Sequence, residues 1–263
     1  MIDIIDSKKI FGFLNDGLKN RIKIETLGKA TSTNTLVREK AKENEEGLVV
    51  VAGEQSAGRG RMGRSFFSPG DSGVYMSLLL KPKIRPEDAV QITTAAAVSV
   101  CRALEKLGVI NPEIKWVNDI YICNKKICGI LTESSFNANS GFLDFAVLGV
   151  GVNIYESEAG FPDEIKNIAG AVFSERKENL RNRFIAEFIN EFFVFYNKLN
   201  SKEHLKEYKE KSFVLGKEIN ILQGGAVREG KAVDIDENCN LVVELPDGKT
   251  EKLYSGEISV RIK

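Results

Sequence analysis

The stretch at residues 53–69 concentrates side chains suited to binding an anion. Arginines alternate there with glycines directly after the apolar run of residues 48–52, and the alternating residues are Gly58, Arg59, Gly60, Arg61, Gly63 and Arg64. Glycine lets the backbone approach a ligand closely and adopt positive φ, while arginine presents a rigid fork of donors to phosphate or carboxylate. The pattern predicts an anion-binding loop that follows a buried strand. A solvated turn or an RGG-like nucleic-acid tail is the alternative, although such tails are repeated and this stretch occurs once.

A second group of candidates lies at residues 115–133. Asn118 and Asp119 fall inside an otherwise apolar strand, where polar groups cost free energy unless they have partners. They form either a hydrogen-bonded core pair or β-bulge, or part of a site. Lys125 and Lys126 begin the next β-rich run, and only one of the two can point inward because neighbouring strand residues face opposite ways. By residue type alone, both are typical surface lysines.

Three motifs, in the same order along the chain, resemble those of the biotin protein ligase family. The glycine-arginine stretch resembles the family's biotin-binding loop, Gly-Arg-Gly-Arg-x-Gly-Arg followed by aromatic-x-Ser-Pro. Lys-Trp-Val-Asn-Asp at residues 115–119 leads through Lys126 to Gly-Ile-Leu-Thr-Glu at residues 129–133, and Gly-Val-Gly-Val-Asn stands at residues 149–153. The resemblance runs from about Ser32 to the C-terminus. The chain departs from the pattern at Val117, where the family usually has proline.

This resemblance implies an ATP-dependent ligase that works in two steps. Biotin carboxylate attacks the α-phosphorus of ATP, giving biotinyl-adenylate and pyrophosphate, and a lysine of a biotin carboxyl carrier protein domain then displaces AMP. Because the first step brings a carboxylate next to a triphosphate, cations must offset the repulsion, with Mg²⁺ on the phosphates. ATP and biotin are thus the expected substrates, and the carrier domain is the expected partner.

The resemblance also assigns residues to tasks. The catalytic residues it implies are Lys126, Arg61 and Lys115. The biotin-binding residues are Ser32, Thr33, Asn34, Gln55, Gly58, Arg59, Gly60, Arg61, Lys126 and Gly129. The residues for ATP and the adenylate are Arg59, Arg61, Arg64, Trp116, Asn118, Asp119 and Asn153, with Asp119 near Mg²⁺ through the phosphates. Ser32–Asn34 could equally be only a helix cap, and a lone tryptophan such as Trp116 is more often a core residue.

Composition narrows the function class. The 263 residues include 37 Lys+Arg and 37 Asp+Glu, so the net charge is zero, which argues against a general nucleic-acid binder. No apolar run is long enough for a membrane span, and the charged start does not resemble a signal peptide; we expect a cytoplasmic protein. The four cysteines form no C-x-x-C pair and are expected to be buried, reduced thiols. The single histidine, His204, lies in a charged stretch and is expected at the surface.

The hydrophobic pattern outlines the elements that would position these residues. Strand patterns stand at residues 22–26, 48–52, 74–80, 114–123, 126–134 and 143–154, and helical patterns at residues 6–15, 33–47, 86–108 and 180–196. Short strand-like runs after residue 211 predict a β module. The resemblance implies an α+β fold: a mixed sheet flanked by helices, like that of class II aminoacyl-tRNA synthetases, in residues 1–212. It implies a small SH3-like β-barrel in residues 213–263, which would include the run at residues 255–259.

Acyl transfer and transcriptional repression are the two alternatives to biotin ligation. Lipoate or octanoate transfer occurs on a related fold, but octanoyl transferases use a cysteine nucleophile and no cysteine stands beside the glycine-arginine loop. A biotin-sensing repressor would need about sixty further N-terminal residues for a helix-turn-helix. The roughly thirty residues before Ser32 predict the monofunctional form without DNA binding. Sheet edges, through which members of the family can dimerise, make a homodimer the expected assembly.

Overall fold

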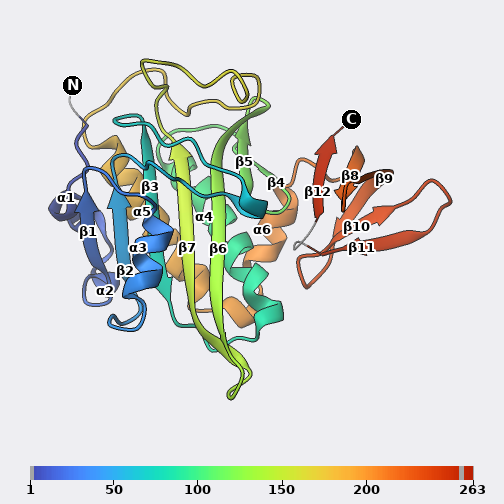
Figure 1. Cartoon of the computed structure of the whole chain (residues 1–263), viewed down its shortest axis with the longest axis horizontal. Helices are drawn as coiled ribbons and strands as arrows, with labels where there is room; N and C mark the ends of the chain where they lie inside the picture. The colour runs from blue at the N-terminus through green and yellow to red at the C-terminus, as the bar shows by residue number, and fades with distance from the viewer. Residues whose placement is uncertain (1–2, 255–257, 263) are drawn as a thin grey trace.

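The computed structural model describes residues 3–254 and 258–262. A mixed seven-stranded sheet forms its centre and a smaller sheet stands at one end (Figure 1). The central strands are β1 (Lys23–Leu27), β2 (Leu48–Ala52), β3 (Gly73–Leu80), β4 (Glu113–Lys115), β5 (Asp119–Ile122), β6 (Lys125–Asn137) and β7 (Phe142–Asn153). They are ordered β1-β2-β3-β7-β6-β5-β4, with β1 parallel to β2 and the other neighbours antiparallel. The predicted α+β class is confirmed.

Helices cover both faces of this sheet (Figure 1). The α-helices are α1 (Ser7–Phe13), α2 (Asp16–Lys19), α3 (Thr33–Lys40), α4 (Val90–Lys106), α5 (Leu180–Tyr196) and α6 (His204–Glu210), and the 3₁₀ turns are η1 (Arg61–Gly63), η2 (Pro86–Ala89) and η3 (Leu199–Ser201). In β2, Val49 and Val51 pack into the core formed with α4 and α5, whereas Val50 packs with Val37 of α3. Because both faces are covered, β2 is apolar at every position. No helix in the described ranges is long and apolar enough to cross a membrane.

The start of the chain is tied into the core through Asp3. Its carboxylate accepts hydrogen bonds from the Tyr155 hydroxyl at 2.9 Å and from the Arg181 backbone N–H at 3.1 Å, and the Arg181 Nε lies 3.4 Å away. All three residues are buried, and a buried charge is tolerated only when it is paired in this way. Asp3 therefore fixes the chain just beyond the end of β7.

The apolar run at residues 114–123 was expected to form one strand, and this is wrong. It forms two strands, β4 and β5, that pair with each other, so residues 116–118 are the turn between them. The reason is that Asn118 bonds elsewhere: its backbone and side chain exchange hydrogen bonds of 2.9 and 2.8 Å with Ile130 of β6. The predicted hairpin between β5 and β6 is confirmed, with Cys123 and Asn124 at positive φ in its turn.

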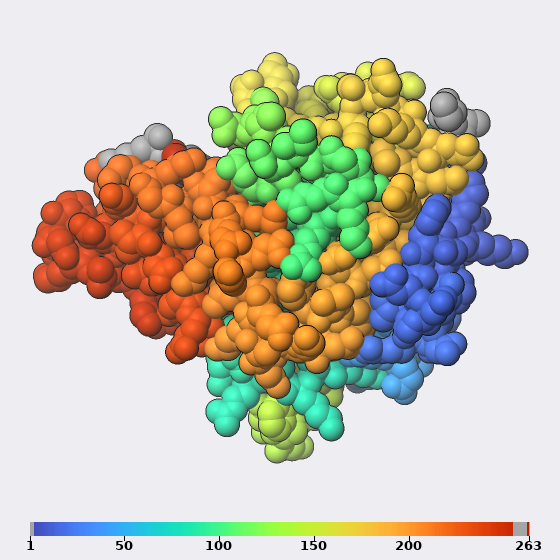
Figure 2. Space-filling view, turned by 180° about the vertical axis from the view of Figure 1, so that it is seen from behind, coloured from blue at the N-terminus to red at the C-terminus, as the bar shows by residue number. Residues whose placement is uncertain are grey.

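The C-terminal region is a five-stranded antiparallel sheet, as the predicted β module required. Its strands are β8 (Glu218–Gln223), β9 (Ala226–Ile235), β10 (Leu241–Glu244), β11 (Thr250–Leu253) and β12 (Ile258–Ile262), in the order β11-β10-β9-β8-β12. Of the run at residues 255–259, the first three lie outside the described residues and the last two begin β12. Figure 2 shows this module projecting from one end of the molecule, in red and orange.

A buried joint connects this module to the main sheet. The Trp116 indole N–H donates to the carbonyl oxygen of Cys239 at 2.9 Å, and the Thr94 hydroxyl lies 3.4 Å from Cys239 Sγ. On its other side the Thr94 hydroxyl lies 2.9 Å from Nε2 of His204 in α6. His204 was expected at the surface, which is wrong: it is 1% exposed. His204, Leu205 and Tyr208 form a buried stripe along α6, a pattern that the surrounding charges concealed. Burial lowers the pKa of His204 to about 4.

Three of the four cysteines are buried, as predicted, and one is exposed. All four are free thiols, and three of them, Cys101, Cys128 and Cys239, are buried. Cys123 is exposed because it stands in the turn between β5 and β6.

Candidate active site

The glycine-arginine loop is a small hairpin that closes on itself. The Gly60 N–H donates to Arg64 O at 2.7 Å, and the Phe66 N–H donates to Gly58 O at 2.9 Å. Two glycines are structurally required. A Cβ on Gly58 would lie 2.4 Å from the Phe66 carbonyl oxygen, and Gly63 has a φ of +72°. The hairpin thereby holds its arginines on a compact backbone.

One pocket gathers the residues predicted for catalysis and nucleotide binding, and we call it the cationic pocket. It is lined by the predicted residues Arg59, Gly60, Arg61, Arg64, Lys115, Trp116, Asn118, Asp119, Lys126 and Gly129, with Phe66, Ile130 and Leu131 among the others. Asp119 is the one carboxylate in its described lining, against five cationic side chains. Such an excess of positive charge in a cleft attracts an anionic ligand.

Lys126, rather than Lys125, faces this pocket. The Lys126 ammonium lies 2.6 Å from the Asp119 carboxylate, while Lys125 turns away and donates to the backbone oxygen of Asn167 at 2.9 Å. Lys126 and Gly129 are three positions apart, which in a regular strand would place them on opposite faces. An irregularity in the β5–β6 register, where Tyr121 pairs with Lys126 and Ile120 with Cys128, brings both to the same pocket.

Arg61 is held at the floor of the cationic pocket by Asn118. Its Nη1 donates to Asn118 Oδ1 at 3.1 Å, and the Asn118 amide in turn donates to Ile130 O at 2.8 Å. Burial lowers the pKa of the Arg61 guanidinium, an effect that the Asp119 carboxylate opposes. A guanidinium partly removed from water interacts more strongly with an incoming anion. This explains the two polar residues in the 115–123 run: Asn118 and Asp119 each position a cation.

A second pocket, which we call the glycine pocket, gathers six of the ten residues predicted for biotin, whereas Gly60, Arg61 and Lys126 line the cationic pocket. It is lined by Ser32, Thr33, Asn34, Gln55, Arg59, Phe66, Met76, Gly129, Leu131, Gly149, Val150 and Gly151. It adjoins the cationic pocket, because Arg59, Phe66, Gly129 and Leu131 line both. Apart from Arg59 on the shared wall, its lining is apolar or uncharged and polar, which suits a neutral ring.

Polar residues in the glycine pocket are fixed by one another. Gln55 Oε1 accepts from the Thr33 backbone N–H at 2.8 Å, and Asn34 Nδ2 donates to Glu133 Oε2 at 2.9 Å. Glu133 also pairs with Arg59, whose Nη2 lies 3.0 Å from Oε1. Ser32 stands at the N-cap of α3, but its side chain makes no capping hydrogen bond. A capping role alone therefore does not account for residues 32–34.

Two residues of the site were missed by the sequence analysis. Phe66 packs between glycines: a Cβ on Gly151 would lie 2.6 Å from its ring, and one on Gly129 would lie 3.1 Å from it. Glu133 pairs with the loop, and strand alternation could have revealed it, because Gly129, Leu131 and Glu133 share one face of β6.

Asn153 and Gly58 are not placed in either pocket. The Asn153 side-chain amide donates to Gly170 O at 3.0 Å, in the segment that follows β7. That segment also pairs with β6, since the Lys126 N–H donates to Ile168 O at 2.8 Å. A ligand contact by Asn153 would require the bond to Gly170 to be exchanged. Gly58 lies within the hairpin, where its missing side chain leaves room for the Phe66 carbonyl oxygen.

The arrangement has clear relatives. Residues 27–153 match the biotin/lipoate A/B protein ligase family, and residues 214–261 match the biotin protein ligase C-terminal domain. The bifunctional ligase/repressor BirA of Bacillus subtilis is 32% identical over 243 residues, which span 88% of this chain and 71% of that protein. The biotin–[acetyl-CoA-carboxylase] ligase of Mycobacterium tuberculosis is 26% identical over 235 residues, 87% of this chain and 85% of that protein.

A solved structure agrees with the fold as well. The biotin protein ligase from Aquifex aeolicus in complex with biotin and ATP is 27% identical and superposes with a TM-score of 0.74, covering 92% of this chain and 99% of that one.

Proposed function

This chain belongs to the biotin protein ligase family, and from that premise we propose that it joins biotin to a lysine of a carrier protein at the expense of ATP. The observation that carries the proposal is the contact between the two pockets. A pocket lined mainly by glycines and by apolar and uncharged polar side chains meets a cationic one along a shared wall that includes Arg59 and Gly129. This order suits a ligand whose apolar ring ends in a carboxylate that must meet a triphosphate.

Activation of biotin would take place where the pockets join. The biotin carboxylate oxygen attacks the α-phosphorus, a new C(O)–O–P linkage forms, and pyrophosphate leaves with the electron pair of the broken P–O bond. Lys126, Arg61 and Lys115 would offset the charge that accumulates on the phosphorus oxygens. Arg59, Arg64, Trp116, Asn118 and Asn153 would hold the nucleotide. Asp119, 2.6 Å from Lys126, keeps that ammonium in position until phosphate replaces it.

Magnesium fits this site only as a companion of the nucleotide. The described residues contain no cluster of three or more metal-ligating side chains, and Asp119 is the carboxylate available in the cationic pocket. Mg²⁺ commonly binds through one or two carboxylates plus substrate phosphates. We propose that Asp119 contributes one oxygen to such an ion, which would neutralise phosphate charge.

Transfer completes the proposed reaction. The acceptor lysine attacks the acyl carbon of biotinyl-adenylate, and AMP leaves. A biotin carboxyl carrier domain is the acceptor we propose. Octanoyl transfer through cysteine is not supported, because no cysteine appears in the described lining of either pocket.

Three further proposals concern the whole molecule. The free thiols and the use of ATP favour the cytoplasm as its compartment. We place the boundary between the catalytic domain and the SH3-like module at residues 212 and 213. A homodimer could form at β6, whose described residues 132–137 pair only with β7; sedimentation velocity would detect it.

The direct test is incubation of the purified chain with ATP, Mg²⁺, labelled biotin and a carrier domain. We expect ATP-dependent labelling of the carrier lysine and biotin-dependent exchange of pyrophosphate into ATP. Labelled lipoate and octanoate serve as controls in parallel reactions. Labelling by lipoate in preference to biotin, or no exchange with biotin, would refute the proposal.

A further inference from the structure

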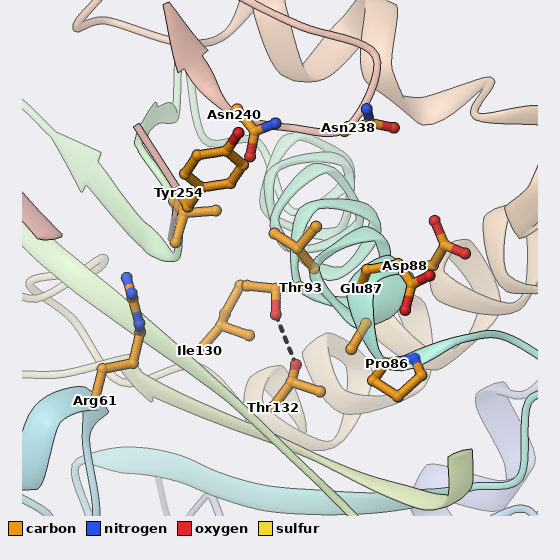
Figure 3. Close-up of a pocket in the computed structure, with 13 residues that line it drawn as sticks. Arg61, Pro86, Glu87, Asp88, Thr93, Ile130, Thr132, Asn238, Asn240 and Tyr254 are labelled. Atoms are coloured by element: carbon orange, nitrogen blue, oxygen red, sulfur yellow. Dashed lines mark hydrogen bonds between the residues drawn. The ribbon is translucent and has the colours of Figure 1, made fainter. Parts of the chain in front are cut away.

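A third cavity, of about 560 Å³, lies beside the cationic pocket. Its walls come from the start of α4 with the preceding turn, the β6 strand, the glycine-arginine loop through Arg61, the β4–β5 turn through Val117, and the C-terminal module through Asn240 and Tyr254 (Figure 3). No step assigned so far uses this cavity. We call it the module cavity, because the C-terminal module closes one side of it.

The module cavity adjoins the cationic pocket, since Arg61 and Ile130 line both. Arg61 lies on one side of it, and Glu87 and Asp88 lie on the other (Figure 3). Apolar side chains, including Val90 and Ile130, line the space between them. Thr93 and Thr132 also line this space and hydrogen-bond to each other at 2.8 Å. The cavity thus has an anionic side, an uncharged and mostly apolar middle, and a cationic side that is part of the proposed catalytic site.

The carboxylates on the anionic side, Glu87 and Asp88, form few ion pairs that would neutralise their charge. Within the described part of the chain Glu87 pairs with Arg85 alone, at 3.8 Å, and the two side chains are 67% and 69% exposed. Exposed pairs at such distances contribute little. Asp88 is half-buried in the cavity lining and is in none of the ion pairs found among the described residues.

We propose that the module cavity is the access channel for the acceptor lysine of the carrier, and that Glu87 and Asp88 attract its ammonium group. The proposal rests on the proposed ligase function and names the surface that serves its second step. The carboxylates steer a positively charged side chain to the channel, as complementary charges do at protein interfaces. The apolar middle accommodates the aliphatic stem of lysine.

The arrangement of acids at one side of the cavity and Arg61 at the other also favours deprotonation of the lysine amine before it attacks. Desolvation and a neighbouring cation both disfavour an ammonium, so the amine loses a proton to solvent as it approaches Arg61. The neutral nitrogen then attacks the acyl carbon of the adenylate. The C–N bond forms, the bond from that carbon to the phosphate oxygen breaks, AMP leaves with the electron pair, and the nitrogen releases a second proton to solvent.

The test separates the two half-reactions. The double variant Glu87→Gln/Asp88→Asn is compared with Glu39→Gln/Glu43→Gln, two exposed acids outside the cavity. Adenylate formation is followed by pyrophosphate exchange, and transfer by single-turnover labelling of a purified biotin carboxyl carrier domain. Discharge of the bound adenylate by hydroxylamine, a small neutral nucleophile, serves as an acceptor-independent readout.

We expect the cavity variant to lose about tenfold in kcat/KM for the carrier at low salt, with a smaller loss at high salt. Pyrophosphate exchange and hydroxylamine discharge should stay within about twofold of the parent chain. A steric variant at the rim, Ala89→Trp, should slow transfer to the carrier more than discharge by hydroxylamine. The Glu39/Glu43 control should transfer normally.

Normal carrier transfer in both the charge and the steric variants would overturn the channel assignment. An equal fall in pyrophosphate exchange and transfer would also overturn it, because the cavity would then serve the nucleotide. Absence of biotin-dependent exchange in the parent chain is a different result, which refutes the ligase function itself.

Discussion

The Lys126 ammonium lies 2.6 Å from the Asp119 carboxylate, across the hairpin formed by β5 and β6. We predict that Lys126→Gln lowers adenylate formation by a hundredfold or more, since loss of one preorganised charge-stabilising group commonly costs about that much. Biotin affinity should change by only a few fold, because the charge is needed mainly in the transition state. Pyrophosphate exchange and calorimetric binding measure the two effects.

Lys125→Gln is the matched control for that variant. Lys125 bonds to the backbone oxygen of Asn167, away from the pocket, so its substitution should be nearly silent. Loss of exchange in the Lys125 variant with retention in the Lys126 variant would show that the two roles are reversed.

Arg61→Gly should loosen the hold on biotinyl-adenylate. Arg61 is anchored to Asn118 at 3.1 Å, and charge-assisted hydrogen bonds contribute about 1.5–3 kcal/mol each. We expect roughly ten- to a hundredfold faster escape of the intermediate, together with weaker biotin binding. Biotin appearing on albumin added to the reaction measures the escape. Normal synthesis with unchanged release would exclude this retaining role.

Glu133→Gln should weaken biotin binding without abolishing turnover at saturating biotin. The carboxylate joins Asn34, at 2.9 Å, to Arg59, at 3.0 Å, and its neutral replacement must turn an amide toward one of these donors. We expect the Kd for biotin to rise about tenfold, in line with the loss of one charge-assisted bond. Glu54→Gln, which breaks the exposed pair with Lys29, is the control. An unchanged Kd in the Glu133 variant would contradict the role.

Acid should destabilise the fold through the buried His204. His204 has a folded pKa of about 4 because of burial, below the ordinary value of about 6.5, so the unfolded chain binds more protons between these limits. The neutral histidine's contribution is complete above about pH 6.5 and is lost as the pH falls toward 4. Its share is about 2 kcal/mol by pH 5.

Urea unfolding at pH 7.5 and 5.0, followed by Trp116 fluorescence, measures that loss. Trp116 is the single tryptophan and bonds to the joint at Cys239. In His204→Gln the difference in unfolding free energy between the two pH values should shrink by about the same amount. An equal pH dependence in both proteins would show that protonation of His204 does not cause the loss of stability in acid.

Local patterns predicted the elements well where burial is regular. The bounds of β2 and α5 follow from an unbroken apolar run and from a stripe with helical spacing. The predictions failed where contacts with residues far away in the sequence determine the local structure or the burial. The turn at residues 116–118 depends on Ile130, and the burial of His204 depends on Thr94, 110 positions away. The module cavity was invisible for the same reason, because β6, α4 and the C-terminal module meet only in the folded chain.

The anchoring of Asp3 bears on how this protein is tagged. The Tyr155 hydroxyl donates to the Asp3 carboxylate at 2.9 Å, and Tyr155 stands two positions after Asn153, at the end of β7. A bulky reporter fused directly before Asp3 would pull on this attachment and so on the strand end beside the proposed nucleotide site. A fusion at that terminus needs a flexible spacer. Without one, weaker use of ATP by the tagged protein would be caused by strain from the fused reporter and not by a property of its site.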